Sequence, residues 1–571
     1  MSAAVRTVER YTYQPEPPPD GALLPAAGQG KIPVSPPDWE HALRILRQMN
    51  SLHELGGRRV SSLIRVDGFE PWWFVQDRLY RFYLLPFTRF REFLRASYGC
   101  QEVRVEQAPR DLARLTGILS GREGFPRFLR LDQEEARRSV LGGARYPTWA
   151  ARAAPSAITW ASLILFRLLR RDTVLYIIDQ LSPGLDHDFR LSPLYRELHA
   201  RGYRVAEYAH TLSARTAVAN SLRRRRPVAF VEAFGELSDP EGPLEPIPMS
   251  PPSPGEAWDF EMVFEHALVP VVMSWCRQSA ARYRRICRAI KFQGAKRAII
   301  LDDNRHNHEL VAACKRMGIK VLGFQHGVLN RFHTGLMAYG FGDGRRHDFD
   351  RYGLWGPVFV ERLSRDSNLF EPGRLFVAGP LRPPPAGGER HPVARPQAGG
   401  IRHVLLVSEP LARRQEVLAY LRPLRGDPHY QLHVKLRPGE LDQELKAYGL
   451  DPREVDIVQT ASVYDAFDKA DVVIGTYSSV LYEAALALRP IVWLKTSMAY
   501  GAELVQEGLA EVAPEPEGVK QAIERAVRLP VDELKRRRQL IWNDARRSGV
   551  ETLLNRAEED LWDPPRGKRR A

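Results

Sequence analysis

From residue 173 onward, short runs of β-branched and aromatic residues alternate with segments of helical periodicity. The apolar runs read TVLYIID, YRVAEYA, PVAFVEAF, RAIILDD and KVLGFQH. Stretches such as SPLYRELHARG and HNHELVAACKRMG separate several of these runs. Apolar runs of this length are typical of strands buried on both faces, and the intervening helices predict a parallel sheet with helices on both sides.

The same alternation begins again near residue 401. Its apolar runs read RHVLLVSEP, YQLHVKLRP, VDIVQ, DVVIGTYSS and PIVWLK. Helical periodicity follows at Val417–Leu421, Val463–Lys469, Leu481–Leu488 and Val519–Val527. A run of Pro and Gly separates the two units and is the clearest domain boundary in the chain. The sequence therefore predicts an α/β protein with two doubly wound, Rossmann-like domains.

The N-terminal part has a different pattern. Residues 1–37 are rich in Pro, Gly and Ala, which predicts a flexible lead. Residues 38–150 are rich in aromatic side chains and Arg at near-helical spacing, so we expect a mainly helical accessory region. The remaining expected boundaries are an N-terminal Rossmann-like domain at 151–380, a linker at 381–400, a C-terminal Rossmann-like domain at 401–545, and a C-terminal helix with a basic tail at 546–571.

The composition indicates the cellular compartment of the protein and the charge of its partners. The chain has 571 residues, with 83 Lys and Arg against 69 Asp and Glu, a net charge of +14 that favours anionic partners. Four cysteines without a CxxC spacing fit a reduced compartment. The first residues lack a signal-peptide pattern, and the longest uncharged apolar stretch, Ala153–Phe166, is shorter than the roughly 20 residues that span a bilayer. We therefore expect a cytoplasmic protein, with the inner face of the cell membrane as a further location to test.

Ligands of open parallel sheets bind at the carboxyl ends of the strands, and this rule selects polar residues in the second unit. In YQLHVKLRP, apolar residues alternate with His433, Lys435 and Arg437, and Arg437 falls at the carboxyl end. Lys435 and Arg437 are candidate phosphate ligands. The alternative is that His433 and Lys435 form surface ion pairs at a sheet edge.

The run DVVIG ends in Thr476-Tyr477-Ser478-Ser479, directly before a strong helix pattern. A helix start offers free N–H groups and a positive dipole end, and hydroxyls there complete an anion site. Simple N-capping by a serine is the alternative. Glu483, one turn later, is placed either to accept from ribose hydroxyls or to be a solvated carboxylate. The candidate donor ligands are thus Lys435, Arg437, Thr476, Ser478, Ser479 and Glu483.

Candidate catalytic residues follow two strands of the first unit. Asp302 and Asp303 come just after RAIIL and are suited to capping a helix or, with a raised pKa, to acting as a general base. His326 ends the next strand, before Gly327, which permits a tight turn or a close ligand approach. The spacing DDNRHNH matches no specific ligand pattern, so we expect no metal and no other cofactor.

These features, in this order, resemble the GT-B glycosyltransferases, and most closely the bacterial capsule and surface-polysaccharide group. That group is similar to the bacterial sialyltransferases, the Kdo transferases and the CDP-glycerol glycerophosphotransferases. The likeness covers about residues 173–545 and rests on the QHG turn, the Arg-Pro turn and the Ser-Ser-x-x-x-Glu helix start. It implies two domains facing a cleft, a nucleotide-sugar donor on the second, an acceptor on the first, and no essential metal.

The resemblance also implies roles for single residues. His326 looks like the histidine of the family's first-domain turn, and Asp303 is similar to its acidic base. Ser478, Ser479 and Glu483 look like the helix start that holds the donor. One departure stands out: the family's usual His-Pro turn is Arg437-Pro438 here. Arginine neutralises phosphate but cannot donate a proton at neutral pH, which argues against a leaving-group acid at this position.

The sequence thus favours an inverting glycosyltransferase that moves a sugar from a nucleotide-sugar donor to a surface polysaccharide or lipid-linked acceptor, with Asp303 or His326 as the base. A CDP-polyol phosphotransferase and a sugar-nucleotide epimerase are the alternative enzymes.

A non-enzymatic basic assembly protein on anionic membrane is a third reading, through the Arg223–Arg226 run and the helix PSAITWASLILFRLLRR. A solvated charge run and a buried core helix explain these segments more simply. Nucleic-acid binding is not expected, because aromatic residues are not interleaved with the cations.

Overall fold

The structure is a computed structural model of the whole chain. The residues that it describes are 6–12, 36–51, 54–55, 58–59, 70–97, 100–106, 110–121, 127–130, 148–182, 184–211, 213–234, 260–301, 307–325, 327–329, 336, 349–367, 370–371, 373–382, 400–408, 414–436, 455–458, 463–497, 501–542 and 548–563.

The first large sheet has seven parallel strands in the order β12-β11-β10-β9-β6-β7-β8. Its strands are β6 (Thr173–Ile178), β7 (Val205–His210), β8 (Val228–Phe230), β9 (Arg297–Leu301), β10 (Lys320–Phe324), β11 (Arg351–Leu354) and β12 (Leu375–Val377). Nearly every position of β6, β9 and β10 is buried, as expected for strands with helices on both faces.

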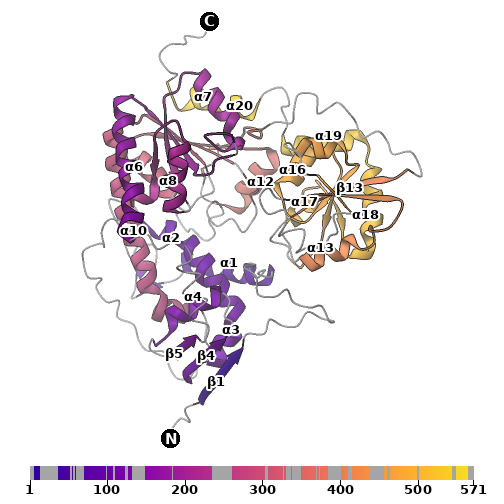
Figure 1. The fold of residues 1–571 in the computed structure, drawn as a ribbon, viewed down its shortest axis with the longest axis horizontal. Coiled ribbons are helices and arrows are strands. Elements are labelled where there is room, and N and C mark those ends of the chain that lie inside the picture. Colours follow the sequence, from indigo (N-terminus) through magenta and orange to yellow (C-terminus); the bar gives the residue numbers. More distant parts are fainter. Residues whose placement is uncertain are drawn as a thin grey trace.

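Helices connect these strands and cover the sheet, and together they form the first lobe (Figure 1). They are α6 (Thr148–Leu168), α7 (Ser192–Ala200), α8 (Ala214–Arg223), α9 (Phe260–Val263), α10 (Val269–Gln293), α11 (Asn307–Arg316) and α12 (Pro357–Asp366), with short non-α turns at Phe189–Leu191, Val231–Phe234 and Phe264–Leu268.

The second large sheet has six parallel strands in the order β15-β14-β13-β16-β17-β18. Its strands are β13 (Arg402–Val407), β14 (Tyr430–Lys435), β15 (Asp456–Ile457), β16 (Val472–Gly475), β17 (Ile491–Leu494) and β18 (Glu511–Ala513). Its helices are α13 (Arg414–Leu421), α15 (Val463–Asp468), α16 (Ser479–Leu486), α17 (Ala502–Gln506), α18 (Val519–Val527) and α19 (Val531–Ile541), with a 3-10 turn at Pro516–Gly518. The two sheets, each in its own lobe, confirm the predicted α/β fold class.

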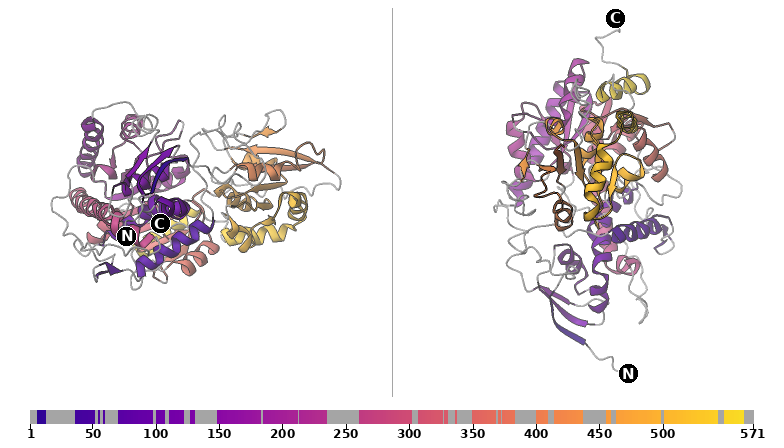
Figure 2. Two further views of the ribbon diagram at one scale, coloured as in Figure 1. Left: turned by 90° about the horizontal axis from the view of Figure 1, so that it is seen from below. Right: turned by 90° about the vertical axis from the view of Figure 1, so that its right-hand side faces the viewer.

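The N-terminal region lies beneath the first lobe (Figures 1 and 2). Its elements are α1 (Pro36–Ser51), α2 (Trp72–Leu79), a π-helical turn (Tyr80–Leu84), α3 (Leu85–Ser97), α4 (Arg110–Leu119), the hairpin β2 (Glu54–Leu55) with β3 (Arg58–Arg59), and the parallel sheet β1 (Arg6–Thr12), β4 (Cys100–Glu106), β5 (Arg127–Arg130).

Strand β1 lies inside the stretch predicted as a flexible lead, so that prediction is wrong for Arg6–Thr12. Its partner β4 begins almost ninety residues later in the chain, and a pairing over that separation leaves no local signal.

An ion pair and two aromatic rings join the lobes. Arg362 of α12 is 2% exposed and donates to Glu507, which follows α17 of the second lobe, with Nε–Oε1 at 2.8 Å and Nη2–Oε2 at 2.5 Å. The ring of Phe359, on the same helix, lies 5.3 Å from the ring of Tyr482 on α16. Gly356, just before α12, allows this approach, because a Cβ there would lie 1.9 Å from the carbonyl oxygen of Ile541.

The chain returns to the first lobe through α20 (Gly549–Asp560), which packs beside α7 (Figure 1). Glu558 accepts from Arg201 Nη1 at 3.0 Å and from the Tyr203 hydroxyl at 2.8 Å. A capping box between Ser548 and Glu551 fixes where the helix begins. Two chain crossings therefore connect the lobes. In the described part of the chain, no helix combines the length and the apolar character needed to cross a bilayer.

Replacing Arg362 by Met is expected to lower the free energy of unfolding by about 3–5 kcal/mol, because it leaves Glu507 buried without its guanidinium. Arg365→Met, one turn along, removes a 69% exposed side chain and should cost at most about 1 kcal/mol. Urea titrations of both variants measure the difference. Equal costs would show that the buried pair does not join the lobes.

Candidate functional site

The second lobe presents hydroxyl groups where β16 gives way to α16. Ser478 is the N-cap of α16, and its Oγ accepts from the backbone N–H of Val480 at 3.3 Å. Ser479 is the first helical residue, and Thr476 is buried at 3% exposure. Ser478 therefore has the capping role that the sequence left as an alternative, while the helix start still faces the carboxyl edge of the sheet.

This helix start lies at the point where the strand order of the second sheet reverses, between β13 and β16. Ligands of open α/β sheets bind at such a switch point. Lys435 ends β14, the strand beside β13, where its carbonyl accepts from the N–H of Ser408 at 3.0 Å. Burial lowers the pKa of Lys435, since the protein solvates its ammonium less well than water does. An anion bound at the switch point would stabilise the ammonium of Lys435 in place of the water that burial removes.

His433 has a structural role instead. Its Nδ1 lies 2.8 Å from Oδ2 of Asp456, and its Nε2 lies 3.0 Å from Nδ1 of His403. Both ring nitrogens are thus engaged across neighbouring strands, and the ring is 4% exposed. The predicted alternation is confirmed, because Leu432 and Val434 lie in the apolar core on the opposite face of β14.

A glycine at a close approach supports the turn before α16. Gly501 precedes α17 with a φ of 82°, in the left-handed region that favours glycine. A Cβ at this position would lie 2.2 Å from the carbonyl oxygen of Thr476 and 2.9 Å from Nε1 of Trp493. Gly501 is therefore packed directly against the backbone of the candidate site.

Charges of the first lobe also act on Glu483 of the second lobe. It follows Ser479 by four residues, so both lie on one side of α16. Burial raises the pKa of Glu483, and the positive charges of Arg382 and Arg190 oppose that rise. Arg382 follows β12 and Arg190 follows β6, so both arginines come from the carboxyl edge of the first sheet. Segments that follow strands of the first sheet therefore bring positive charge near enough to Glu483 to act on its carboxylate.

The two arginines are held in place by their own neighbours. Nη2 of Arg190 donates to Asp188 at 2.6 Å and to Gln180 at 3.1 Å. The guanidinium of Arg382 lies 4.6 Å from the ring centre of Phe189. Arginine side chains lose considerable rotamer freedom when a ligand fixes them, and these contacts have already removed part of it.

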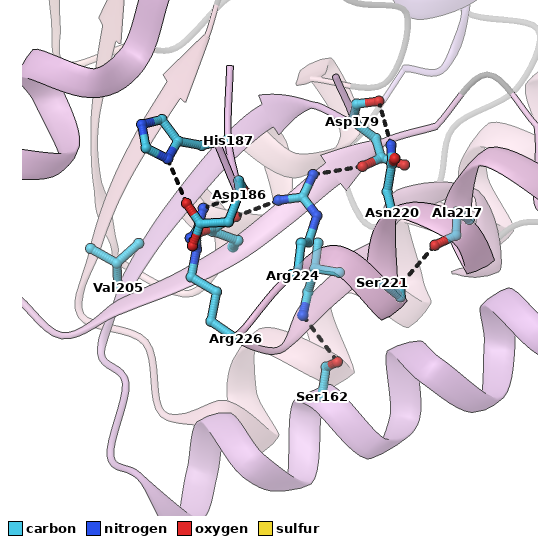
Figure 3. Close-up of polar contacts among 12 residues, drawn as sticks. Ser162, Asp179, Asp186, His187, Val205, Ala217, Asn220, Ser221, Arg224 and Arg226 are labelled. Carbon is cyan, nitrogen blue, oxygen red and sulfur yellow. Dashed lines mark hydrogen bonds and ion pairs between the residues drawn. The ribbon is translucent and has the colours of Figure 1, made fainter. Parts of the chain in front are cut away.

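A buried charge network anchors the segment that carries Arg190 (Figure 3). Arg224, just after α8, has no exposed side-chain surface and donates to Asp179 at 2.6 Å and to Glu207 at 2.8 Å. Arg226 continues the network by donating to Glu207 and to Asp186. Because Asp179 and Asp186 belong to the segment after β6, the network fixes that segment to β7 and β8.

The hydrogen bonds continue from Asp186 to the start of α7. His187 Nδ1 lies 2.7 Å from Oδ1 of Asp186, and its Nε2 lies 2.8 Å from Oγ of Ser192. Both ends of the segment between β6 and α7 are therefore held by side chains.

Asp179 follows β6 in the same way that Asp302 follows β9, and these strands flank the switch point of the first sheet. The strand-end rule that selected Asp302 also applies to Asp179, yet the sequence did not single it out. Asp179 is fully buried against Arg224, so it positions the segment and does not face a ligand. Its Oδ2 has no hydrogen-bond partner within the described part of the chain.

The predicted catalytic residues Asp302, Asp303 and His326 lie outside the described residues, and so does the donor candidate Arg437. The residues on either side of position 326 make hydrogen bonds. Gln325 accepts from the N–H of Trp355 at 3.0 Å and donates to the carbonyl of Gly327 at 2.9 Å. Gly327 has no left-handed φ, and a Cβ there would meet nothing within 4 Å, so neither backbone strain nor packing within the described residues requires glycine here.

In the second lobe, Lys435 ends β14, and Thr476, Ser478, Ser479 and Glu483 lie between the end of β16 and the first turns of α16. That they form one donor site stays a prediction. The sequence missed Arg190 and Arg382, and no local pattern marks them. Among the described residues, no group of three or more His, Cys, Asp or Glu is arranged to hold a metal ion.

Replacing Glu483 by Gln is expected to raise the melting temperature near pH 7, because the carboxylate is destabilised by burial. The stability that protonated Glu483 provides is complete below its ordinary pKa and is lost as the pH rises through the raised folded value. The Gln variant should lack this loss, whereas Glu515→Gln at an exposed position should retain it. Calorimetry between pH 4 and 8 tests this, and parallel profiles for all three proteins would contradict it.

No protein-family model and no curated protein matches this chain. Similar solved structures include the calicheamicin glycosyltransferase CalG4, at 15% identity and a TM-score of 0.42 over 69% of this chain and 98% of that one. MurG of Acinetobacter baumannii is 13% identical, with a TM-score of 0.39 over 67% of this chain and 99% of that one. The UDP-GlcNAc 2-epimerase of Methanocaldococcus jannaschii, in complex with UDP-GlcNAc and UDP, is 12% identical, with a TM-score of 0.41 over 68% of this chain and 99% of that one. No conclusion on chemistry rests on these similarities.

Proposed function

We propose that this protein is a nucleotide-sugar-dependent glycosyltransferase of the GT-B type that moves a sugar to a surface polysaccharide or lipid-linked acceptor with inversion at the anomeric carbon. The observation that carries the proposal is the start of α16 at the switch point of the second sheet, with Glu483 one turn along and the positive charges of Arg190 and Arg382 acting on that carboxylate. A nucleotide sugar combines a ribose diol, which a carboxylate binds, with a diphosphate, which cations and helix N–H groups bind.

On the donor side, Glu483 accepts hydrogen bonds from the ribose hydroxyls, and the first N–H groups of α16 with Ser479 bind a phosphate oxygen. Lys435, at the end of the neighbouring strand β14, and Arg437, two residues further, add positive charge. Charge develops on the leaving diphosphate as its bond to the sugar breaks, and cations already in place stabilise it most. Thr476, just after β16, is a further donor ligand.

On the acceptor side, Asp303 or His326 removes the proton of the acceptor hydroxyl. The acceptor oxygen forms a bond to the anomeric carbon while the bond from that carbon to the diphosphate oxygen breaks, and the electron pair leaves with the nucleotide. A single displacement of this kind inverts the configuration. Asp302 beside Asp303 would raise the pKa of the neighbouring carboxyl, as a base near pH 7 requires.

The buried network under the segment after β6 gives Arg190 and Arg382 a further role. Because both side chains come from the first lobe, their attraction to a donor diphosphate on the second lobe draws the lobes together around the substrate. No metal is needed for charge neutralisation in this scheme, since four cationic side chains surround the diphosphate. We expect the enzyme to act in the cytoplasm, at the inner face of the cell membrane.

A thermal-shift screen of CMP, CDP, UDP and GDP identifies the donor class, because a ligand that binds only the folded state raises the melting temperature. We expect one nucleotide to stabilise the protein and EDTA to leave that shift unchanged. The labelled sugar nucleotide of that base, offered with membrane extract, should then give a glycoside. A phosphodiester product would instead indicate polyol-phosphate transfer, and a free epimer would indicate epimerisation.

The double variant Arg437→Ala, Ser479→Ala should lose at least about tenfold in nucleotide affinity, since each removed contact to a charged phosphate contributes about 1.5–3 kcal/mol. Unchanged sugar transfer by this variant would overturn the donor assignment.

Nucleotide affinity should fall at alkaline pH through Lys435. Its pKa is lowered in the free protein, and a bound phosphate raises it, so binding is strongest below the lowered pKa and weakens as the pH rises through it. Titration calorimetry between pH 7 and 10 measures this slope. Lys435→Gln should bind on the order of tenfold more weakly at pH 7 and lose the slope, whereas Lys469→Gln, at an exposed position, should keep both. A slope retained in Lys435→Gln would contradict the assignment.

A further inference from the structure

Helix α6 buries its hydroxyl residues beside Leu163 and Phe166 and leaves other large apolar residues exposed. Its hydroxyl residues face the protein: Oγ1 of Thr159 accepts from the N–H of Phe230 at 2.9 Å, and Oγ of Ser162 accepts from the N–H of Val228 at 3.1 Å. Both acceptors are buried, and both donors belong to β8, the edge strand of the first sheet. The hydroxyls thus cover a sheet edge that would otherwise expose free N–H groups.

The opposite face of α6 exposes large apolar side chains. Trp160, Ile164 and Leu168 follow at intervals of four residues on one side of the helix and are 52%, 51% and 72% exposed. Leu165 and Leu169 lie beside them and are 43% and 52% exposed. The sequence favoured a buried core helix here, and that interpretation is wrong for this face. The pattern of buried hydroxyls and exposed Trp, Ile and Leu is unfavourable in water.

The two helices that contact α6 also carry exposed large apolar residues. Helix α6 contacts α8 and α10, and these residues are Leu222 on α8, at 84%, and Phe292 on α10, at 42%. Arg167 of α6 donates to the carbonyl of Phe292 at 2.6 Å and lies 5.3 Å from its ring centre. We call this set the α6 face: Trp160, Ile164, Leu165, Leu168, Leu169, Leu222 and Phe292.

Positive charge borders the α6 face. None of the three helices contains Asp or Glu. Exposed basic side chains follow or end each helix, namely Arg170 after α6, Arg223 and Arg225 at the end of α8, and Lys291 near the end of α10. An apolar surface with Trp and Leu, bordered by Arg and Lys, matches the interface of an anionic bilayer, where acyl chains lie beneath negatively charged headgroups.

We propose that the α6 face binds the surface of an anionic lipid bilayer, with Trp160, Ile164 and Leu168 entering the interface and Arg223 and Arg225 contacting headgroups. A second copy of the chain fits less well, because a two-fold dimer through this face would place the arginines of one copy against those of the other. Helix α6 lies at the outer side of the first lobe, away from the second sheet (Figures 1 and 2). Docking there leaves the candidate donor site accessible, and the inference stands independently of the proposed function.

Sedimentation with vesicles tests the proposal on the full chain. Binding to vesicles that contain phosphatidylglycerol at low salt should exceed binding to phosphatidylcholine vesicles at least about tenfold and fall at high salt. The variant Trp160→Gln, Ile164→Gln, Leu168→Gln should lower binding to phosphatidylglycerol vesicles at least about tenfold. Ile401→Gln, Val531→Gln, two exposed apolar residues of the second lobe, is the matched control and should bind as the unmodified protein does.

Two further measurements separate the outcomes. Arg223→Gln, Arg225→Gln should weaken binding to phosphatidylglycerol vesicles and reduce its salt dependence. Brominated lipid should quench tryptophan fluorescence in the unmodified protein and less so in Trp160→Phe. Vesicle binding equal in all variants, or self-association that the triple variant abolishes without vesicles, would overturn the proposal. Vesicle binding without nucleotide binding would contradict the proposed function alone.

Discussion

A buried arginine needs carboxylates beside its guanidinium, and in the first lobe Arg224 meets this need through one residue just after β6 and one on β7. These ion pairs fix how the segments around Arg224 are arranged. Removing an unpaired guanidinium from water is costly, so Arg224 requires both Asp179 and Glu207 at hydrogen-bond distance. Meeting that requirement fixes the end of β6 relative to β7, and Arg226 extends the restraint to Asp186. The segment that bears Arg190 therefore leaves the sheet in a defined direction, toward α16. The position of Arg190, whose charge acts on Glu483 across the lobes, depends on this restraint.

Elsewhere in the molecule, too, some residues hold an element in place while its other residues are left for binding. In the second lobe, Gly501 and the cap at Ser478 hold the turn before α16, the helix on which Ser479 and Glu483 lie one turn apart. At the outer side of the first lobe, Thr159 and Ser162 hold α6 to the sheet and leave its apolar face to solvent. A donor site between the lobes and a bilayer surface on the outer side would let one molecule bind a water-soluble donor while it remains near a lipid-linked acceptor.

The sequence predicted the two parallel sheets well, because strands buried on both faces are continuous apolar runs and Pro-Gly segments separate the units. It placed Lys435 and the start of α16 at the carboxyl edge for the same reason. It missed β1, β18 and the two arginines that reach Glu483, since these depend on contacts between distant segments. It misjudged α6 because composition shows that a helix is apolar but not which face is buried. The positions of Asp302, Asp303, His326 and Arg437 stay predictions.

A crystal structure of the full chain with a non-hydrolysable donor analogue would show whether a nucleotide sugar binds at the start of α16 with the first lobe facing it. We expect the diphosphate within hydrogen-bond distance of the Ser479 N–H and Lys435 Nζ, the ribose hydroxyls on Glu483, and Arg190 or Arg382 turned toward the phosphates. A donor bound elsewhere on the molecule, with Glu483 in contact with solvent or protein only, would contradict this expectation.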